Sequence, residues 1–356
     1  MSSARSVNGV LNVPVIDIAA FRTGSAPERA AIARAVDRAA TRVGFMQITG
    51  HGIPADVLDG LTGAMDAFFA LPLEEKTATR PASKAVNRGY TAPKTERLSH
   101  SLGVYSADDL FEAFNIGSQA ADFPGLGLPD EHYPANLWPS RTTGFRDGVT
   151  GWFEHAGGVS RTMTDIFALA LDLPDGFFHR YQDHSIDVLR MNNYQLPPED
   201  AVLEPGQLGM GAHTDYGIVT VLWADPVRGL QILDTDGDWH DVVPAPGALL
   251  INLGDLLARW TNDRWISTMH RVLAPIDADG RLYRRRSAAY FHDGNHDAVI
   301  ATLPGCASAG RPSPYEPVTV ADHLVQKLAG SRGLALNTDA EREAARLRTG
   351  SRTPAS

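Results

Sequence analysis

The sequence has very little cysteine and no long apolar run. Cys306 is the only cysteine among 356 residues, so no intrachain disulfide can form, and one loop thiol fits a reducing compartment. No apolar stretch approaches the roughly 20 residues that a membrane-spanning helix needs. The segment Met1–Asn12 is polar and lacks the apolar core of a signal peptide. We therefore expect a cytoplasmic protein without a membrane partner.

Positive charge is also scarce. The chain has 32 Lys and Arg against 42 Asp and Glu, which gives a net charge of −10. Nucleic-acid binding needs a basic surface, so we expect no nucleic-acid partner and a small-molecule ligand instead. The motifs H-E-x-x-H and G-x-S-x-G are absent, and the glycines Gly206, Gly209 and Gly211 indicate turns, not a dinucleotide site. We expect a monomer, with a homodimer as the alternative.

Helical periodicity dominates the first half of the chain. Ser25 and Glu28 have capping-box spacing, and the apolar pattern behind them ends at Gly44. The same spacing predicts three further helices, at 57–68, 145–170 and 319–328. Between the first and second of these, residues 77–139 are rich in Gly and Pro. This segment predicts binding loops, with a short strand at 110–116.

Short β-like runs follow Pro174, and Gly, Pro and Asp separate them. Regularly spaced short strands without intervening helices indicate a sandwich or barrel. Two earlier strands are expected at 13–16 and 45–49. The later runs are 188–192, 218–223, 230–233, 239–243, 248–252, 269–273 and 287–291.

Two histidines and one carboxylate suggest a metal site in this β-rich half. His213 and Asp215 are two residues apart at the start of an expected strand, so their side chains would share one face. His270 lies on a later expected strand that a barrel can bring alongside. Two imidazoles and one carboxylate bind one face of an iron ion and leave the other face open.

A receptor for a carboxylate is predicted on the following strand. Arg285 and Ser287 are two residues apart, and an arginine fork with a hydroxyl suits a bound carboxylate. Strand alternation turns at least one residue of the run Arg284–Arg286 inward. Asn192 and Tyr194 repeat the spacing on an earlier strand and can add donors.

These motifs together resemble the Fe(II)/2-oxoglutarate-dependent oxygenases of the isopenicillin N synthase-like family. The resemblance rests on His213-Thr214-Asp215, Gly247–Asp255, His270-Arg271-Val272 and Arg285-x-Ser287, and it covers about residues 12 to 330. The run Asn192–Pro197 departs from the plant form of its motif. We therefore do not expect the flavonoid or hormone substrates of the plant enzymes.

The resemblance implies a mainly β fold with helices. A double-stranded β-helix, or jelly roll, forms its core, with packed N-terminal helices and a C-terminal helix. It implies that His213, Asp215 and His270 bind Fe(II), and that Arg285 and Ser287, with Tyr194 and Asn192, bind 2-oxoglutarate. The implied divisions are a disordered N-terminus at 1–12, a helical and loop region at 13–175, the jelly-roll core at 176–318, a C-terminal helix at 319–336 and a mobile tail at 337–356.

The implied reaction consumes O2 and converts 2-oxoglutarate to succinate and CO2, while hydrogen abstraction leads to hydroxylation, desaturation or ring formation. Three functions stay open: this one, an Fe(II)/O2 oxidase of the same family that does not use 2-oxoglutarate, and a zinc hydrolase or non-catalytic jelly-roll binder. We expect a metabolite of secondary metabolism, such as antibiotic biosynthesis, as substrate.

Substrate-contacting residues are expected at Tyr90, Phe114 and Phe291. We interpret the polar run at His292, Asp293, His296 and Asp297 as a loop at the pocket rim, with a second metal site as the alternative.

Overall fold

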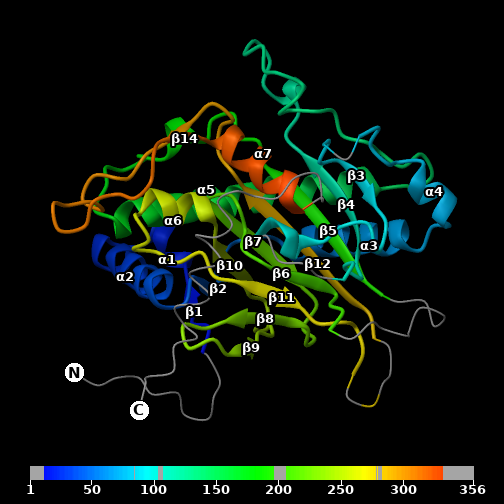
Figure 1. The fold of residues 1–356 in the computed structure, drawn as a ribbon, viewed down its shortest axis with the longest axis horizontal. Helices are drawn as coiled ribbons and strands as arrows, with labels where there is room; N and C mark the ends of the chain where they lie inside the picture. The colour runs from blue at the N-terminus through cyan, green and yellow to red at the C-terminus, as the bar shows by residue number, and fades with distance from the viewer. Residues whose placement is uncertain are drawn as a thin grey trace.

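The computed structural model describes residues 12–83, 85–102, 107–195, 206–277, 279 and 283–331. The expected disordered N-terminus, apart from residue 12, and the expected mobile tail lie outside the described residues. Two antiparallel-rich sheets face each other, and helices cover the outer side of the larger one (Figure 1). The fold is therefore mainly β with packed helices around a jelly-roll core, as predicted.

The larger sheet has eight strands in the order β1-β2-β10-β7-β12-β5-β4-β3. Only the β1–β2 pair is parallel. Strands β1 to β4 come from the region in front of residue 176, yet they extend the same sheet as the core strands. In sheet order, the strands are Val15–Asp17, Phe45–Thr49, Leu249–Leu253, Val219–Ala224, Arg285–His292, Val188–Tyr194, Glu112–Gly117 and Gly89–Thr91.

The smaller sheet has the order β6-β11-β8-β9 and carries two of the predicted metal-binding histidines. Its strands are Met210–His213, His270–Val272, Leu230–Leu233 and Trp239–Asp241. The pairing of β6 with β11 places His270 directly opposite His213. A separate pair, β13 (Val299–Ile300) and β14 (Val318–Thr319), leads into the C-terminal helix.

Helices form where the sequence predicted them. The capping box is present: the Ser25 backbone N–H donates to the Glu28 carboxylate at 2.7 Å, and the Ser25 side chain faces the Glu28 backbone N–H. Helices α2 and α5 pack on the larger sheet, and α3 packs on α5 (Figure 1). The helices are α1 (Ala19–Thr23), α2 (Ala26–Arg42), α3 (Ala55–Phe69), α4 (Leu73–Thr77), α5 (Phe145–Ala170), α6 (Asp255–Trp260) and α7 (Val320–Ser331), with 3-10 turns η1 (Leu98–Leu102), η2 (Ala120–Asp122) and η3 (His179–Tyr181).

None of the helices in the described part of the chain combines the length and the apolar character needed to cross a membrane.

An aromatic cluster joins α3 and α5 to the larger sheet. Phe114 on β4 is fully buried, with ring centroids 4.6 Å from Phe68 and 5.2 Å from Phe145. Tyr90 on β3 packs on Phe68 and donates a hydrogen bond to Glu112 at 2.7 Å. Burying rings of this size stabilises the helix–sheet contact by about 1.5–3 kcal/mol for each phenylalanine.

Candidate active site

His213, Asp215 and His270 converge on one point between the two sheets. The Asp215 Oδ1 atom lies 3.7 Å from His213 Nε2 and 3.6 Å from His270 Nε2. The two imidazole centroids are 4.3 Å apart. All three side chains are buried, and one ligand atom from each lies within 4.8 Å of the others.

Hydrogen bonds orient each of these groups with a ligand atom directed toward the common point. Nδ1 of His213 lies 2.8 Å from the Gly211 carbonyl, and Nδ1 of His270 lies 3.1 Å from the Thr268 carbonyl. A proton on Nδ1 that is donated to a carbonyl leaves the Nε2 lone pair for a metal, and such outer partners commonly fix metal-binding histidines.

Asp215 is held by the larger sheet. Its Oδ2 atom accepts hydrogen bonds from Thr220 on β7 at 2.5 Å and from Asn252 on β10 at 2.6 Å, which leaves Oδ1 for a metal. Thr220 was not singled out from the sequence, and Asn252 was noted only as part of the family motif.

The expected strand geometry at this point is wrong in one respect. Strand β6 ends at His213, and Asp215 lies in the connection that follows. The Asp215 carbonyl accepts the Asp255 backbone N–H at 2.8 Å, which anchors this connection to the start of α6. Tertiary hydrogen bonds therefore fix the carboxylate, where strand alternation was expected to do so.

The His213 imidazole is kept neutral. Burial and the neighbouring His270 lower the pKa of His213 to about 3. A neutral imidazole is the form that binds a metal.

Arg285 and Ser287 lie on β12 with their side chains toward the same interior space. Both are 2% exposed, and their cross-strand partners on β5 are Tyr194 and Asn192. Asn192 donates to Ser287 Oγ at 3.3 Å, and the Arg285 guanidinium carbon lies 5.2 Å from the Tyr194 ring centroid.

Two nitrogens of Arg285, Nε and Nη1, are buried and have no hydrogen-bond partner among the described residues. A buried guanidinium with unsatisfied N–H groups costs free energy unless an acceptor arrives. Burial also raises the pKa of the Tyr194 hydroxyl, although Arg285 and Ser287 oppose that rise, so this group is a neutral donor. The constellation suits a carboxylate ligand.

The neighbouring arginines confirm the predicted alternation. Arg284 pairs with Asp66 at 2.6 Å, and Arg286 pairs with Asp225 at 3.0 Å, both on the other side of the strand. Only Arg285 of this run lines the interior space.

A cavity of about 440 Å³ connects the His213–Asp215–His270 cluster with Arg285 and Ser287. It lies within the size range of small-molecule sites. Its wall is mostly apolar, and helix α7 contributes Ala321, Leu324, Val325 and Leu328 to it. Two charged features of the cavity wall were not apparent from the sequence. They are Arg88 and the half-buried Arg190–Glu96 ion pair, in which Arg190 Nη2 lies 2.6 Å from Glu96 Oε2.

The three expected substrate residues lie in different places. Phe291 lines this cavity. Tyr90 lines a smaller neighbouring cavity that also contains Arg88 and Glu96. Phe114 lies in the aromatic cluster and lines neither cavity, because residues of one strand alternate between the helix-covered face and the interior face.

The polar run after β12 divides into two parts. His292 is buried and hydrogen-bonds through Nδ1 to Asp187 at 3.0 Å and through Nε2 to Gln182 at 2.8 Å. Asp293 lines the cavity, and burial raises its pKa well above the usual value. His296 and Asp297 lie in a different cluster, with His184.

Comparison with known protein families gives two matches. Residues 13–141 match the model for the N-terminal region of non-haem dioxygenases, described as "non-haem dioxygenase in morphine synthesis N-terminal". Residues 185–294 match the 2OG-Fe(II) oxygenase superfamily. The chain is 36% identical over 314 residues to the 2-oxoglutarate-Fe(II) type oxidoreductase hxnY of Emericella nidulans, with 87% of each chain covered.

The chain belongs to the 2-oxoglutarate–Fe(II) oxygenase superfamily.

Another relative and a solved structure match this oxygenase over most of their length. Validamycin A dioxygenase of Streptomyces hygroscopicus subsp. limoneus is 32% identical over 333 residues, covering 91% of this chain and 89% of the relative. A crystal structure of a full-length Neurospora crassa protein in complex with alpha-KG and 5-formyluracil superimposes with a TM-score of 0.79 at 29% identity, covering 93% of this chain and 100% of that one. The oxygenase is therefore a 2-oxoglutarate-dependent dioxygenase that acts on a small molecule with Fe(II) as cofactor.

The residues of the site fit both Fe(II) and 2-oxoglutarate. The His–Asp–His cluster matches the donor set that non-haem Fe(II) oxygenases use. The unsatisfied N–H groups of Arg285 suit a carboxylate such as those of 2-oxoglutarate.

Helix α7 is joined to the site by a buried ion pair. Lys327 Nζ lies 2.8 Å from Asp255 Oδ2, and each side chain is 3% exposed. The same Asp255 oxygen accepts the Thr214 hydroxyl at 2.9 Å, between two of the clustered residues. Although burial alone raises the pKa of Asp255, Lys327 lowers it to about 2, so the carboxylate stays charged.

Replacing Lys327 with Met should destabilise the oxygenase by about 3–5 kcal/mol, because it leaves the Asp255 carboxylate buried without its cation. Chemical denaturation of the metal-free protein measures this change. Arg228→Met is the matched control, since Arg228 forms an exposed pair with Asp241. Equal effects of the two substitutions would contradict the buried role of Lys327.

Proposed function

We propose that this oxygenase binds Fe(II) through His213 Nε2, Asp215 Oδ1 and His270 Nε2. The convergence of these atoms, their burial and the outward hydrogen bonds of each group support the assignment. The three residues line the cavity, so an iron ion held by them would adjoin the space that the substrate can enter.

We further propose that Arg285 and Ser287 bind the far carboxylate of 2-oxoglutarate. Asn192 orients the Ser287 hydroxyl, and Tyr194 packs beside the guanidinium. The bound iron and 2-oxo acid, with O2, supply the oxidation that releases succinate and CO2 and removes a hydrogen atom from the substrate. The protein positions the carboxylate and excludes water from the site.

The substrate is proposed to occupy the rest of the cavity, between Phe291 and helix α7. The apolar wall with a few charged groups suits a metabolite that is mostly apolar with a polar end. The similarity to validamycin A dioxygenase supports a role in secondary metabolism, such as antibiotic biosynthesis. The oxygenase would act as a cytoplasmic monomer without nucleic-acid or membrane partners, in keeping with its acidic composition.

The unsatisfied Arg285 fork is the observation that carries the cosubstrate assignment. An Fe(II)/O2 oxidase without 2-oxoglutarate would use the same fork for a substrate carboxylate. The 36% identity to a relative named as a 2-oxoglutarate-Fe(II) type oxidoreductase favours 2-oxoglutarate.

A screen of candidate metabolites tests this function. With Fe(II), O2 and 2-oxoglutarate, the correct substrate class should increase succinate release above the rate without substrate. The increase should vanish without O2 and without 2-oxoglutarate. Product formation that continues without 2-oxoglutarate would contradict the proposal and support the oxidase.

A further inference from the structure

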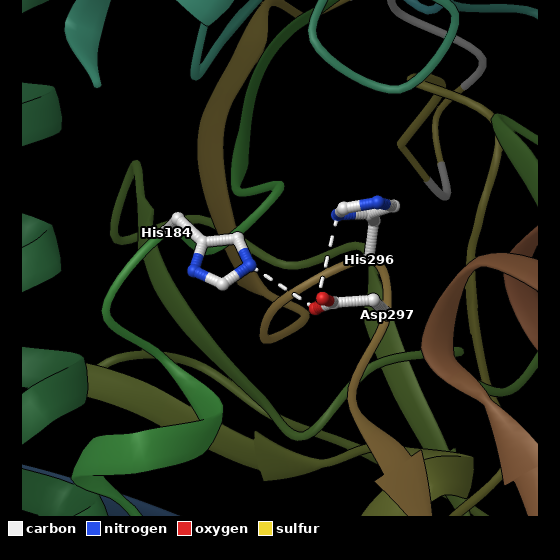
Figure 2. A group of neighbouring side chains, drawn as sticks. All are labelled: His184, His296 and Asp297. Atoms are coloured by element: carbon white, nitrogen blue, oxygen red, sulfur yellow. Dashed lines mark hydrogen bonds and ion pairs between the residues drawn. The ribbon is translucent and has the colours of Figure 1, made fainter. Parts of the chain in front are cut away.

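A second cluster of metal-binding side chains lies outside the candidate iron site. Figure 2 shows His184, His296 and Asp297 directed toward one another. His184 lies in the connection between η3 and β5, and the other two lie in the connection between β12 and β13. One possible ligand atom from each lies within 4.8 Å of the others.

The distances in this cluster are close to those of a tetrahedral zinc site. His184 Nε2 lies 3.1 Å from Asp297 Oδ1, and His296 Nδ1 lies 3.9 Å from the same oxygen. Bonds of roughly 2.0–2.1 Å in a tetrahedral site separate the ligand atoms by about 3.3 Å. The Asp297 side chain is 62% exposed, so it can rotate by the small amount needed.

His184 is oriented as zinc-binding histidines are. Its Nδ1 lies 2.6 Å from Asp183 Oδ1 and can donate a proton there. Its Nε2 faces Asp297 and would bind a metal that displaces the proton shared with that carboxylate. A carboxylate behind the ring is the usual outer partner of a metal-binding histidine. Asp183 is itself fixed, because Asn295 donates to it at 2.7 Å.

His296 faces Asp297 through Nδ1, which also lies 3.2 Å from the Tyr133 hydroxyl. That hydroxyl donates its single proton to the His184 carbonyl, so it can only accept from His296. Metal binding at Nδ1 therefore requires the tautomer of His296 that carries its proton on Nε2. The His132 ring centroid lies 5.2 Å from that of His296.

The backbone that carries these ligands is held in place. Asn295 is 2% exposed, accepts the His184 N–H at 2.9 Å and donates to the Arg180 carbonyl at 3.2 Å. The His296 carbonyl accepts the Ala321 N–H of α7 at 3.0 Å. The two connections are therefore joined before any ion arrives, which lowers the entropy cost of binding.

We propose that His184, His296 and Asp297 form a second metal site, for a divalent transition metal of the zinc class, separate from the iron site. Imidazole and carboxylate ligands favour Zn2+ over Mg2+ and Ca2+, and water or His132 completes the coordination. His132 and its neighbours line the substrate cavity, so this site adjoins the cavity wall.

Zinc stoichiometry of the untagged, metal-free full-length chain tests the site. The wild-type chain should bind two Zn2+ ions, and the His213→Ala/His270→Ala variant should bind one. Adding Asp297→Ala or His296→Ala to that variant should abolish the remaining binding at a zinc concentration that saturates the parent. Asp165→Ala is the matched control, because Asp165 forms an exposed pair with His179 at 2.9 Å, and it should leave one ion bound.

Hydrogen exchange locates the ion in the same proteins. Zinc added to the His213→Ala/His270→Ala variant should slow amide exchange in residues 183–187 and 293–297. The proposal is overturned if that variant binds no zinc, if zinc binding survives both Asp297→Ala and His296→Ala, or if exchange in both segments is unchanged. Asp297 is exposed, so its substitution leaves the fold intact and keeps the test decisive.

Discussion

Replacing His213 with Ala should abolish succinate release. The substitution removes one of two imidazoles from a three-residue cluster, and the remaining His270 and Asp215 cannot hold the iron in the geometry that the reaction needs. We expect turnover to fall to the background of iron in solution. Iron content after desalting and succinate formation with substrate measure the two parts of this effect.

His51 provides the control for this substitution. Its ring bonds to the Gly247 carbonyl at 3.1 Å and to the Ile53 N–H at 3.2 Å, away from the cluster. His51→Ala should retain iron and turnover. Wild-type activity in His213→Ala would remove the metal assignment altogether.

Replacing Arg285 with Ala should raise the KM for 2-oxoglutarate by at least about 100-fold. Hydrogen bonds to charged groups contribute roughly 1.5–3 kcal/mol each, and the substitution removes two or more of them. The iron requirement should change little, because Arg285 is not one of the three clustered metal-binding residues. Titrations of 2-oxoglutarate and Fe(II), with succinate as readout, separate the two effects.

Arg284 is a matched control on the adjacent position. Its side chain pairs with Asp66 on the other side of β12, so Arg284→Ala should leave the 2-oxoglutarate KM unchanged. An unchanged KM in Arg285→Ala would mean that the fork binds another acid, as in an oxidase that does not use 2-oxoglutarate.

Local patterns in the sequence predicted most of the elements. The capping box at Ser25 and Glu28 located the start of α2. The turn residues on either side of two apolar runs gave the correct first and last residues of β2 and β8. These predictions succeed because spacing along the chain determines which side chains share a face. Helices α4 and α6 are too short to show a period, and neither was predicted.

The site was only partly predictable. Spacing on β12 indicated that Arg285 and Ser287 face one way, and their cavity positions agree. The partners of Asp215 were not predictable, because Thr220 and Asn252 reach it from two strands whose order depends on sheet pairing. Spacing could not separate Phe291 on the cavity wall from Phe114 in the core.

The cluster of His184, His296 and Asp297 likewise could not be predicted from sequence spacing. His296 and Asp297 stood out in the sequence beside His292 and Asp293, but their third partner, His184, is remote along the chain. The pairing of Ser185 with Asn295 brings the two segments together. Long-range pairing of this kind leaves no periodic signal in either segment.

Helix α7 contributes to the cavity wall but carries none of the residues proposed to bind iron or 2-oxoglutarate. The groups proposed to hold iron and the acid cosubstrate lie on strands, apart from Asp215 in the connection after β6. One wall of the cavity proposed for the substrate comes instead from helix α7. Substitutions at the apolar positions of α7 can therefore change which substrate fits the cavity. They leave the residues proposed to bind iron and 2-oxoglutarate unchanged. Related proteins can therefore differ in substrate through substitutions in α7.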